Sequence, residues 1–175
     1  MEDPSYHDMN IYVRELALKV AKATAADKKI LVLWYYAGHG TQDNTVSMML
    51  NQAEGKHSYP IESQLRTLSK CNSAYIVGLM DCCRNKIKTR GPGDDPYNEP
   101  VEDGENIILA FGCPPSNDTP ALSTLAFDFF NFLENSADAN GYIALPGNLN
   151  FFQTQDRKNE TLIKVTQPVL LRLTD

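Results

Sequence analysis

The chain has 175 residues, of which 42% are hydrophobic and 22% are charged, and its formal net charge is −6. This length and composition indicate a single globular domain with a hydrophobic core. The negative charge and the lack of a basic stripe argue against a nucleic-acid partner. No apolar run reaches the roughly 18 residues that a membrane span needs, so we expect neither nucleic acid nor a membrane among its partners.

The cysteines indicate a reducing environment. The sequence contains Cys71, Cys82, Cys83 and Cys113. Adjacent cysteines are a poor disulfide framework, and their spacing does not match that of a zinc site. The first 30 residues are polar and mixed in charge, unlike a secretory signal. We therefore expect free thiols, no bound metal and a cytoplasmic location.

The first half of the chain alternates helical and strand patterns. Apolar residues at helical spacing predict a helix over residues 5–27. Residues 29–36, KILVLWYY, are apolar on both faces, which is typical of a strand that is covered on both sides in a parallel sheet. A short edge strand or hairpin is expected over residues 44–52, and a second helix is expected to begin near Pro60.

The second half continues the alternation. Buried strands are expected over residues 73–80, SAYIVGLM, and 105–113, ENIILAFGC, and a helix over residues 120–135. Between the two strands, residues 85–105 are rich in Pro, Gly and charge, which predicts an exposed loop. Strands that alternate with helices imply an α/β fold with a mostly parallel sheet and helices on both faces. Active sites in such sheets lie beyond the carboxyl ends of the strands.

Reactive side chains follow two of the predicted strands. His39 lies between two glycines after the first strand, and Cys83 ends the next one. Parallel neighbours would bring these ends together, so that the imidazole takes the thiol proton and the N–H groups of Gly40 and Cys83 stabilise an oxyanion. Because successive strand side chains alternate between faces, Asp81 and Cys83 share one side while Cys82 packs inside.

The two segments YYAGHG and DCCRN, in this order, resemble those of the caspase-like cysteine peptidases, which comprise caspases, metacaspases and paracaspases. Paracaspases are the most similar, with a tyrosine-rich strand that ends in A-G-H-G and an L-x-D-x-C-R segment. The resemblance implies a three-layer caspase-like fold and a cysteine endopeptidase of polypeptide substrates that uses no cofactor. It implies that Cys83 is the nucleophile, His39 the general base and Gly40 an oxyanion donor. Asp81 would line the pocket for the residue before the cleaved bond, so that residue would be Arg or Lys. The segment GCPPSNDTPA departs from the family's pocket loop, and Asp118 would stand in for an acid there.

The resemblance also implies a domain organisation. The whole chain, residues 1–175, would be one peptidase domain. A large-subunit-like part would extend over about residues 1–90 and a small-subunit-like part over about residues 105–175.

Arg84, directly after the nucleophile, is expected to be structural through pairing with a carboxylate.

The predicted loop, residues 85–105, carries two further hypotheses. Metacaspases are activated by calcium, and the acidic half of the loop has carboxylates of the kind that bind Ca²⁺. It lacks alternating ligand spacing, however, so a solvated charge run is favoured over a calcium site. The family often cleaves itself in this region, and the basic half contains the candidate self-cleavage sites Lys86, Lys88 and Arg90.

One departure from the family supports an alternative function. The family's domain opens with a β-α-β unit before the histidine strand, whereas this sequence has only a helix there. A sheet without those strands would expose an apolar edge. The alternative is therefore a catalytically inactive interaction module or an incomplete domain. Parts of the family form homodimers through the last strand, which would correspond to residues 167–173, QPVLLRL.

Overall fold

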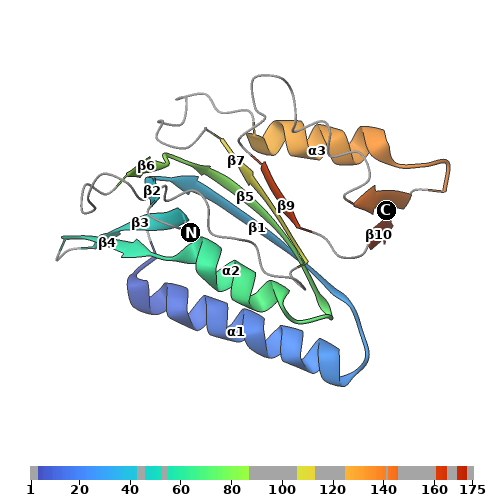
Figure 1. The fold of residues 1–175 in the computed structure, drawn as a ribbon, viewed down its shortest axis with the longest axis horizontal. Coiled ribbons are helices and arrows are strands. Elements are labelled where there is room, and N and C mark those ends of the chain that lie inside the picture. Colours follow the sequence, from blue (N-terminus) through green and yellow to red (C-terminus); the bar gives the residue numbers. More distant parts are fainter. Residues whose placement is uncertain are drawn as a thin grey trace, which may run out of the picture.

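A computed structural model of the chain describes residues 4–42, 46–52, 55–86, 106–112, 125–140, 142–145, 161–164 and 169–172. Among these described residues, the main sheet has four strands in the order β1-β5-β7-β9 (Figure 1). The first three run parallel and the fourth runs antiparallel to its neighbour. The strands are β1 (Ile30–Gly38), β5 (Ala74–Cys82), β7 (Ile107–Phe111) and β9 (Thr161–Lys164). The prediction of a mostly parallel sheet is confirmed.

Helices cover both faces of this sheet and complete three layers. α1 (Tyr6–Ala25) and α2 (Ile61–Ser69) lie on one face, and α3 (Leu125–Ser136) lies on the other (Figure 1). α1 begins where the Ser5 hydroxyl accepts a hydrogen bond from the Asp8 N–H at 3.1 Å. Within the described part of the chain, none of these helices combines the length and the apolar character needed to cross a bilayer.

The two faces of the sheet differ in how far the helices cover them. Every residue of β5 from Ala74 to Met80 is buried, which confirms a strand covered on both sides. β1 is different, because α3 packs over β5 and β7 and leaves the corresponding face of β1 open. The prediction that residues 29–36 are covered on both sides is therefore wrong. On this face the exposed fractions are 42% for Leu31, 47% for Leu33 and 53% for Tyr35.

A second sheet joins the carboxyl ends of β1 and β5. Its strand order is β4-β3-β2-β6, and the β3–β4 pair is the antiparallel hairpin expected near residues 44–52. The loop predicted over residues 85–105 does not begin at residue 85, because β6 pairs in parallel with β2; residues 87–105 lie outside the described part. The strands are β2 (Gly40–Gln42), β3 (Val46–Gln52), β4 (Gly55–Tyr59) and β6 (Asn85–Lys86).

The described residues near the C-terminus form a further antiparallel pair. β8 (Tyr142–Leu145) pairs with β10 (Val169–Arg172), which contains most of the final apolar segment. Ile143 and Leu145 of β8 are buried beside α3.

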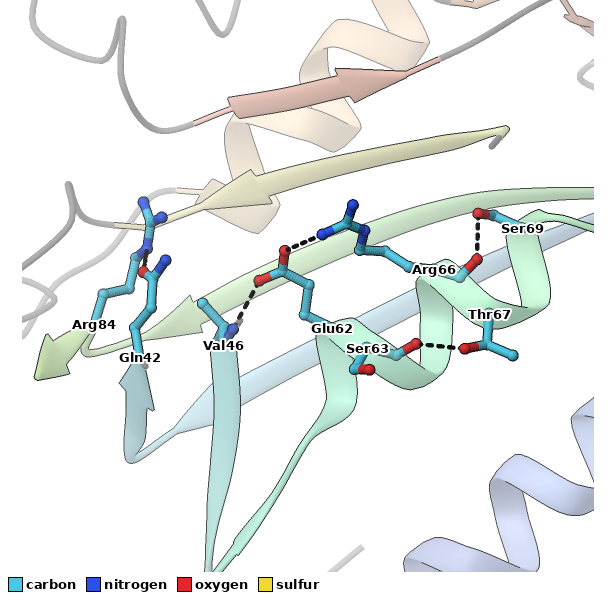
Figure 2. Close-up of polar contacts among 8 residues, drawn as sticks. All are labelled: Gln42, Val46, Glu62, Ser63, Arg66, Thr67, Ser69 and Arg84. Atoms are coloured by element: carbon cyan, nitrogen blue, oxygen red, sulfur yellow. Dashed lines mark hydrogen bonds and ion pairs between the residues drawn. The ribbon is translucent and has the colours of Figure 1, made fainter. Parts of the chain in front are cut away.

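A buried carboxylate anchors the second sheet to α2. Glu62 Oε2 accepts a hydrogen bond of 2.7 Å from the Val46 N–H, at the start of β3 (Figure 2). Glu62 Oε1 lies 3.9 Å from Arg66 Nη1 on the next turn of the helix. Both side chains are buried, so the charge of each is shielded from water and depends on its partner.

Replacing Glu62 by alanine is expected to lower the free energy of unfolding by about 3 kcal/mol, because Arg66 and the Val46 N–H would lose a buried partner. Glu62→Gln should cost less, since its amide oxygen can still accept the hydrogen bond from Val46. Urea denaturation monitored by circular dichroism measures both effects. A loss below about 0.5 kcal/mol for Glu62→Ala, the range of ordinary surface substitutions, would contradict this role.

Candidate active site

The carboxyl ends of β1 and β5 bring two of the predicted site residues together. At the last pair of these parallel strands, Gly38 lies opposite Cys82. Just beyond, β2 pairs with β6 in the same direction. His39 and Cys83 lie between these two pairings, at adjacent positions of the backbone. His39 is exposed and Cys83 is half-buried, so both are open to solvent at this edge.

Close backbone contact at Gly40 explains why glycine follows the histidine. A Cβ atom at this position would lie 2.6 Å from Cys82 Sγ and 2.6 Å from the carbonyl oxygen of Cys83. No other residue fits without a shift of the cysteine strand. Cys82 is fully buried, as expected from the alternation of side chains along the strand. The backbone at Gly40 thus lies close against the Cys82 side chain and the Cys83 carbonyl oxygen.

A tyrosine that the sequence analysis did not single out supports the histidine. The Tyr36 hydroxyl donates a hydrogen bond of 2.6 Å to the carbonyl oxygen of His39. A Cβ atom at Gly38 would lie 2.7 Å from this hydroxyl, so the glycine before the histidine makes room for it. Each glycine beside His39 is therefore required for a different steric reason: Gly38 leaves room for the Tyr36 hydroxyl, and Gly40 leaves room for the cysteine segment.

The Asp81 carboxylate has an unusual environment. Its Oδ1 is shielded from solvent and has no hydrogen-bond partner among the described residues. On the flanking strands it lies beside Ala37, its pair on β1, and Gly112, which follows β7 and donates to the Met80 carbonyl oxygen at 2.9 Å. Neither of these two strand neighbours has a side chain larger than a methyl group. Tyr35 lies on the same face, and burial together with the charge of Asp81 raises the pKa of Tyr35.

Arg84 and Gln42 form a buried contact behind the cysteine. Arg84 Nε donates a hydrogen bond of 2.7 Å to Gln42 Oε1 (Figure 2). The guanidinium carbon lies 4.0 Å from the centroid of the Phe111 ring. Both polar side chains are at most 5% exposed. A structural Arg84 was expected; this hydrogen bond goes to an amide oxygen, and pairing of Arg84 with a carboxylate stays a prediction.

Of the remaining predicted site residues, Lys86 lies in β6 just beyond this edge, opposite Gln42 of β2. Lys88, Arg90 and Asp118 lie outside the described residues. The acidic stretch considered for calcium also lies outside them. Among the residues that the structure does describe, no group of three or more His, Cys, Asp or Glu side chains could hold a metal ion. Cys71, Cys82 and Cys83 are free thiols.

Comparison with known proteins agrees with the resemblance seen in the sequence. Residues 1–125 match the family model of the caspase domain, and this range includes both His39 and Cys83. The chain is also similar to a protein named paracaspase from Dictyostelium discoideum, with 31% identity over 88 residues. The match covers 48% of this chain and 20% of the relative, so the chain corresponds to only a small part of that protein.

Proposed function

Because the chain belongs to the caspase-domain family, we propose that it is a cysteine endopeptidase with Cys83 as nucleophile and His39 as general base. The supporting observation is the position of these residues at adjacent ends of two parallel strands. The absence of a side chain at Gly40 allows the two ends to approach closely. A thiol and an imidazole are the two groups needed for a cysteine nucleophile that is activated by a general base.

The proposed reaction has two steps. Cys83 Sγ attacks the peptide carbonyl carbon while His39 takes the thiol proton, and the N–H groups of Gly40 and Cys83 stabilise the oxyanion. His39 then gives the proton to the leaving amine as the C–N bond breaks, and a thioester remains on Cys83. Water, deprotonated by His39, attacks this thioester and releases the carboxylate product and the free thiol.

Asp81 supports a preference for Arg or Lys before the cleaved bond. A carboxylate oxygen that is shielded from water without a hydrogen bond is unfavourable. A guanidinium or ammonium group of the substrate would supply the missing donor in a charge-assisted contact. We propose Asp118 as a further acid of the same pocket.

The test of this function is hydrolysis of fluorogenic peptides that end in Arg, Lys, Asp or Asn, with and without calcium. Cleavage after Arg or Lys is expected, and the pair of conditions tests the calcium hypothesis directly. No cleavage of any peptide by chains shown by circular dichroism to be folded would contradict the peptidase function.

Tyr35 is expected to favour Arg over Lys, because its half-exposed ring offers a face on which a planar guanidinium can stack. Tyr35→Leu should lower kcat/KM for Arg peptides about threefold to tenfold more than for Lys peptides. Tyr35→Phe retains the ring and serves as the matched control, with an unchanged ratio. An equal loss for both substrates in Tyr35→Leu would contradict stacking.

Self-cleavage is proposed at Lys86, Lys88 or Arg90, because these basic residues follow the nucleophile in the chain and match the proposed specificity. Intact-mass measurement after incubation would detect a cut after one of them. An unchanged mass in a preparation that cleaves Arg peptides would rule the proposal out.

The exposed apolar residues of β1 favour a second candidate function, an interaction module that forms a homodimer. β1 is the last strand of its sheet among the described residues, and Leu31, Leu33 and Tyr35 lie open on one face. Exposed apolar edge strands tend to pair with another chain. Sedimentation at increasing concentration should show a dimer that Leu33→Lys disrupts; a monomer throughout would exclude it.

A further inference from the structure

Arg84 directly follows the proposed nucleophile, and its burial is informative. A guanidinium is costly to remove from water unless its donors and its charge are matched. Arg84 is nevertheless only 5% exposed. Its Nε donates to Gln42 Oε1, and its flat face lies over the Phe111 ring at 4.0 Å from the centroid. A surface lysine or arginine would need neither contact.

The contacts of Arg84 join three segments that meet at the active-site edge. Gln42 ends β2 and lies three residues after His39. Phe111 ends β7, which pairs with β5 on the side opposite to β1. Figure 2 shows the Arg84 and Gln42 side chains directed toward one another, with Gln42 at the end of β2 and Arg84 between β5 and β6. The guanidinium therefore links the histidine-bearing segment, the cysteine-bearing segment and the third strand.

Cys83 lies between two buried residues in the chain. The preceding residue, Cys82, is fully buried in the core, and the following residue, Arg84, is also buried. Cys83 itself is half-buried and open to solvent. Its backbone is thus held at both neighbours while its side chain stays accessible, which suits a group that must meet a substrate in one orientation.

We infer that Arg84 is a positioning residue, which together with Gln42 forms a brace that holds Cys83 in register with the histidine turn. The expected effect of this brace on catalysis rests on the proposed function. The brace acts through the backbone of Cys83 and does not touch the substrate. Its loss should therefore lower kcat and leave KM nearly unchanged.

The test compares Arg84→Met, Arg84→Lys and Gln42→Met in the full chain. Arg84→Met and Gln42→Met are each expected to lower kcat about 100-fold, the scale of a misplaced reacting group. The double variant should be little worse than either single one, since both remove the same contact. Arg84→Lys should not restore the rate, because an ammonium group has neither the Nε donor nor the planar stacking face.

A second measurement does not depend on peptide hydrolysis. Alkylation of Cys83 by chloroacetamide, followed by peptide mass mapping, should slow about tenfold at pH 7 in the brace variants. Under the proposed function His39 activates this thiol, and the brace would no longer hold the two segments in register. Cys71 is an internal reference far from this edge. The hydrogen bond with the Thr24 hydroxyl lowers the pKa of Cys71, and the alkylation rate of this thiol should be unchanged in the brace variants.

The possible results distinguish a role of Arg84 in positioning Cys83 from a general effect on folding. They also distinguish failure of this inference from failure of the proposed function. Parallel changes at Cys71 and Cys83, or wild-type kcat in both Met variants, would overturn the inference. If Arg84→Met fails to fold, Gln42→Met removes the hydrogen bond alone and gives the answer. If even the wild type hydrolyses no peptide while Cys83 alkylation depends on Arg84, the peptidase proposal fails and the brace stands.

Discussion

Cys83→Ala is expected to lower kcat/KM for Arg and Lys peptides by at least about 10⁴-fold, whereas Cys82→Ala should stay within about tenfold of the wild type, because it removes no reacting group. The two residues are adjacent in the chain, but their environments differ. Cys83 is half-buried at the strand end beside the histidine turn, and Cys82 is fully buried against Gly40. Initial rates at equal concentrations of folded protein measure the difference.

His39→Gln provides the matching test of the general base. Its loss should be of the same order as that of Cys83→Ala, and the double variant should be no worse, because the two groups act as a unit. Thermal unfolding of each variant serves as the control. Cys82→Ala removes a buried sulfur and should cost about 1–2 kcal/mol of stability. Loss of activity in Cys82→Ala with full activity in Cys83→Ala would reverse the assignment of the nucleophile.

The sheet and its helices follow from local patterns that the sequence displays. The apolar run of β5 predicts a strand buried on both faces, and this strand is buried on both faces. The same pattern in β1 predicts a strand buried on both faces, which is wrong, because the pattern shows only which residues are apolar. Whether Leu31 and Leu33 are covered depends on where α3 packs, and α3 comes much later in the chain.

The candidate site likewise has residues that the sequence reveals and supporting contacts that it does not. The histidine between glycines and the cysteine at a strand end are visible as short motifs, because their chemistry depends on residue type and strand order. The supporting contacts are not visible. The Arg84–Gln42 hydrogen bond joins residues 42 positions apart, and it depends on the register of β2 against β6. The Tyr36 hydroxyl reaches His39 only because Gly38 leaves room for it.

Asp81→Asn is expected to lower kcat/KM for Arg and Lys peptides by about 10²–10³-fold, the cost of removing one partner from a shielded charge pair. The amide would retain the shape of the side chain but not its charge. Alkylation of Cys83 should be unchanged, because the nucleophile and its base are untouched. Rates for peptides ending in Asn should fall much less, so the ratio of Arg to Asn cleavage is the measurement.

The stability of Asp81→Asn distinguishes substrate binding from a structural role. A carboxylate that capped a turn would lose hydrogen bonds on replacement, and the protein would become less stable. Asp81 Oδ1 instead lacks a hydrogen-bond partner among the described residues although it is shielded from water. Removing this charge should leave the free energy of unfolding unchanged or raise it by up to about 1 kcal/mol, as occurs where a site is kept for function at the expense of stability. A loss of stability together with unchanged specificity would assign Asp81 to the fold and remove the reason for expecting a basic residue before the cleaved bond.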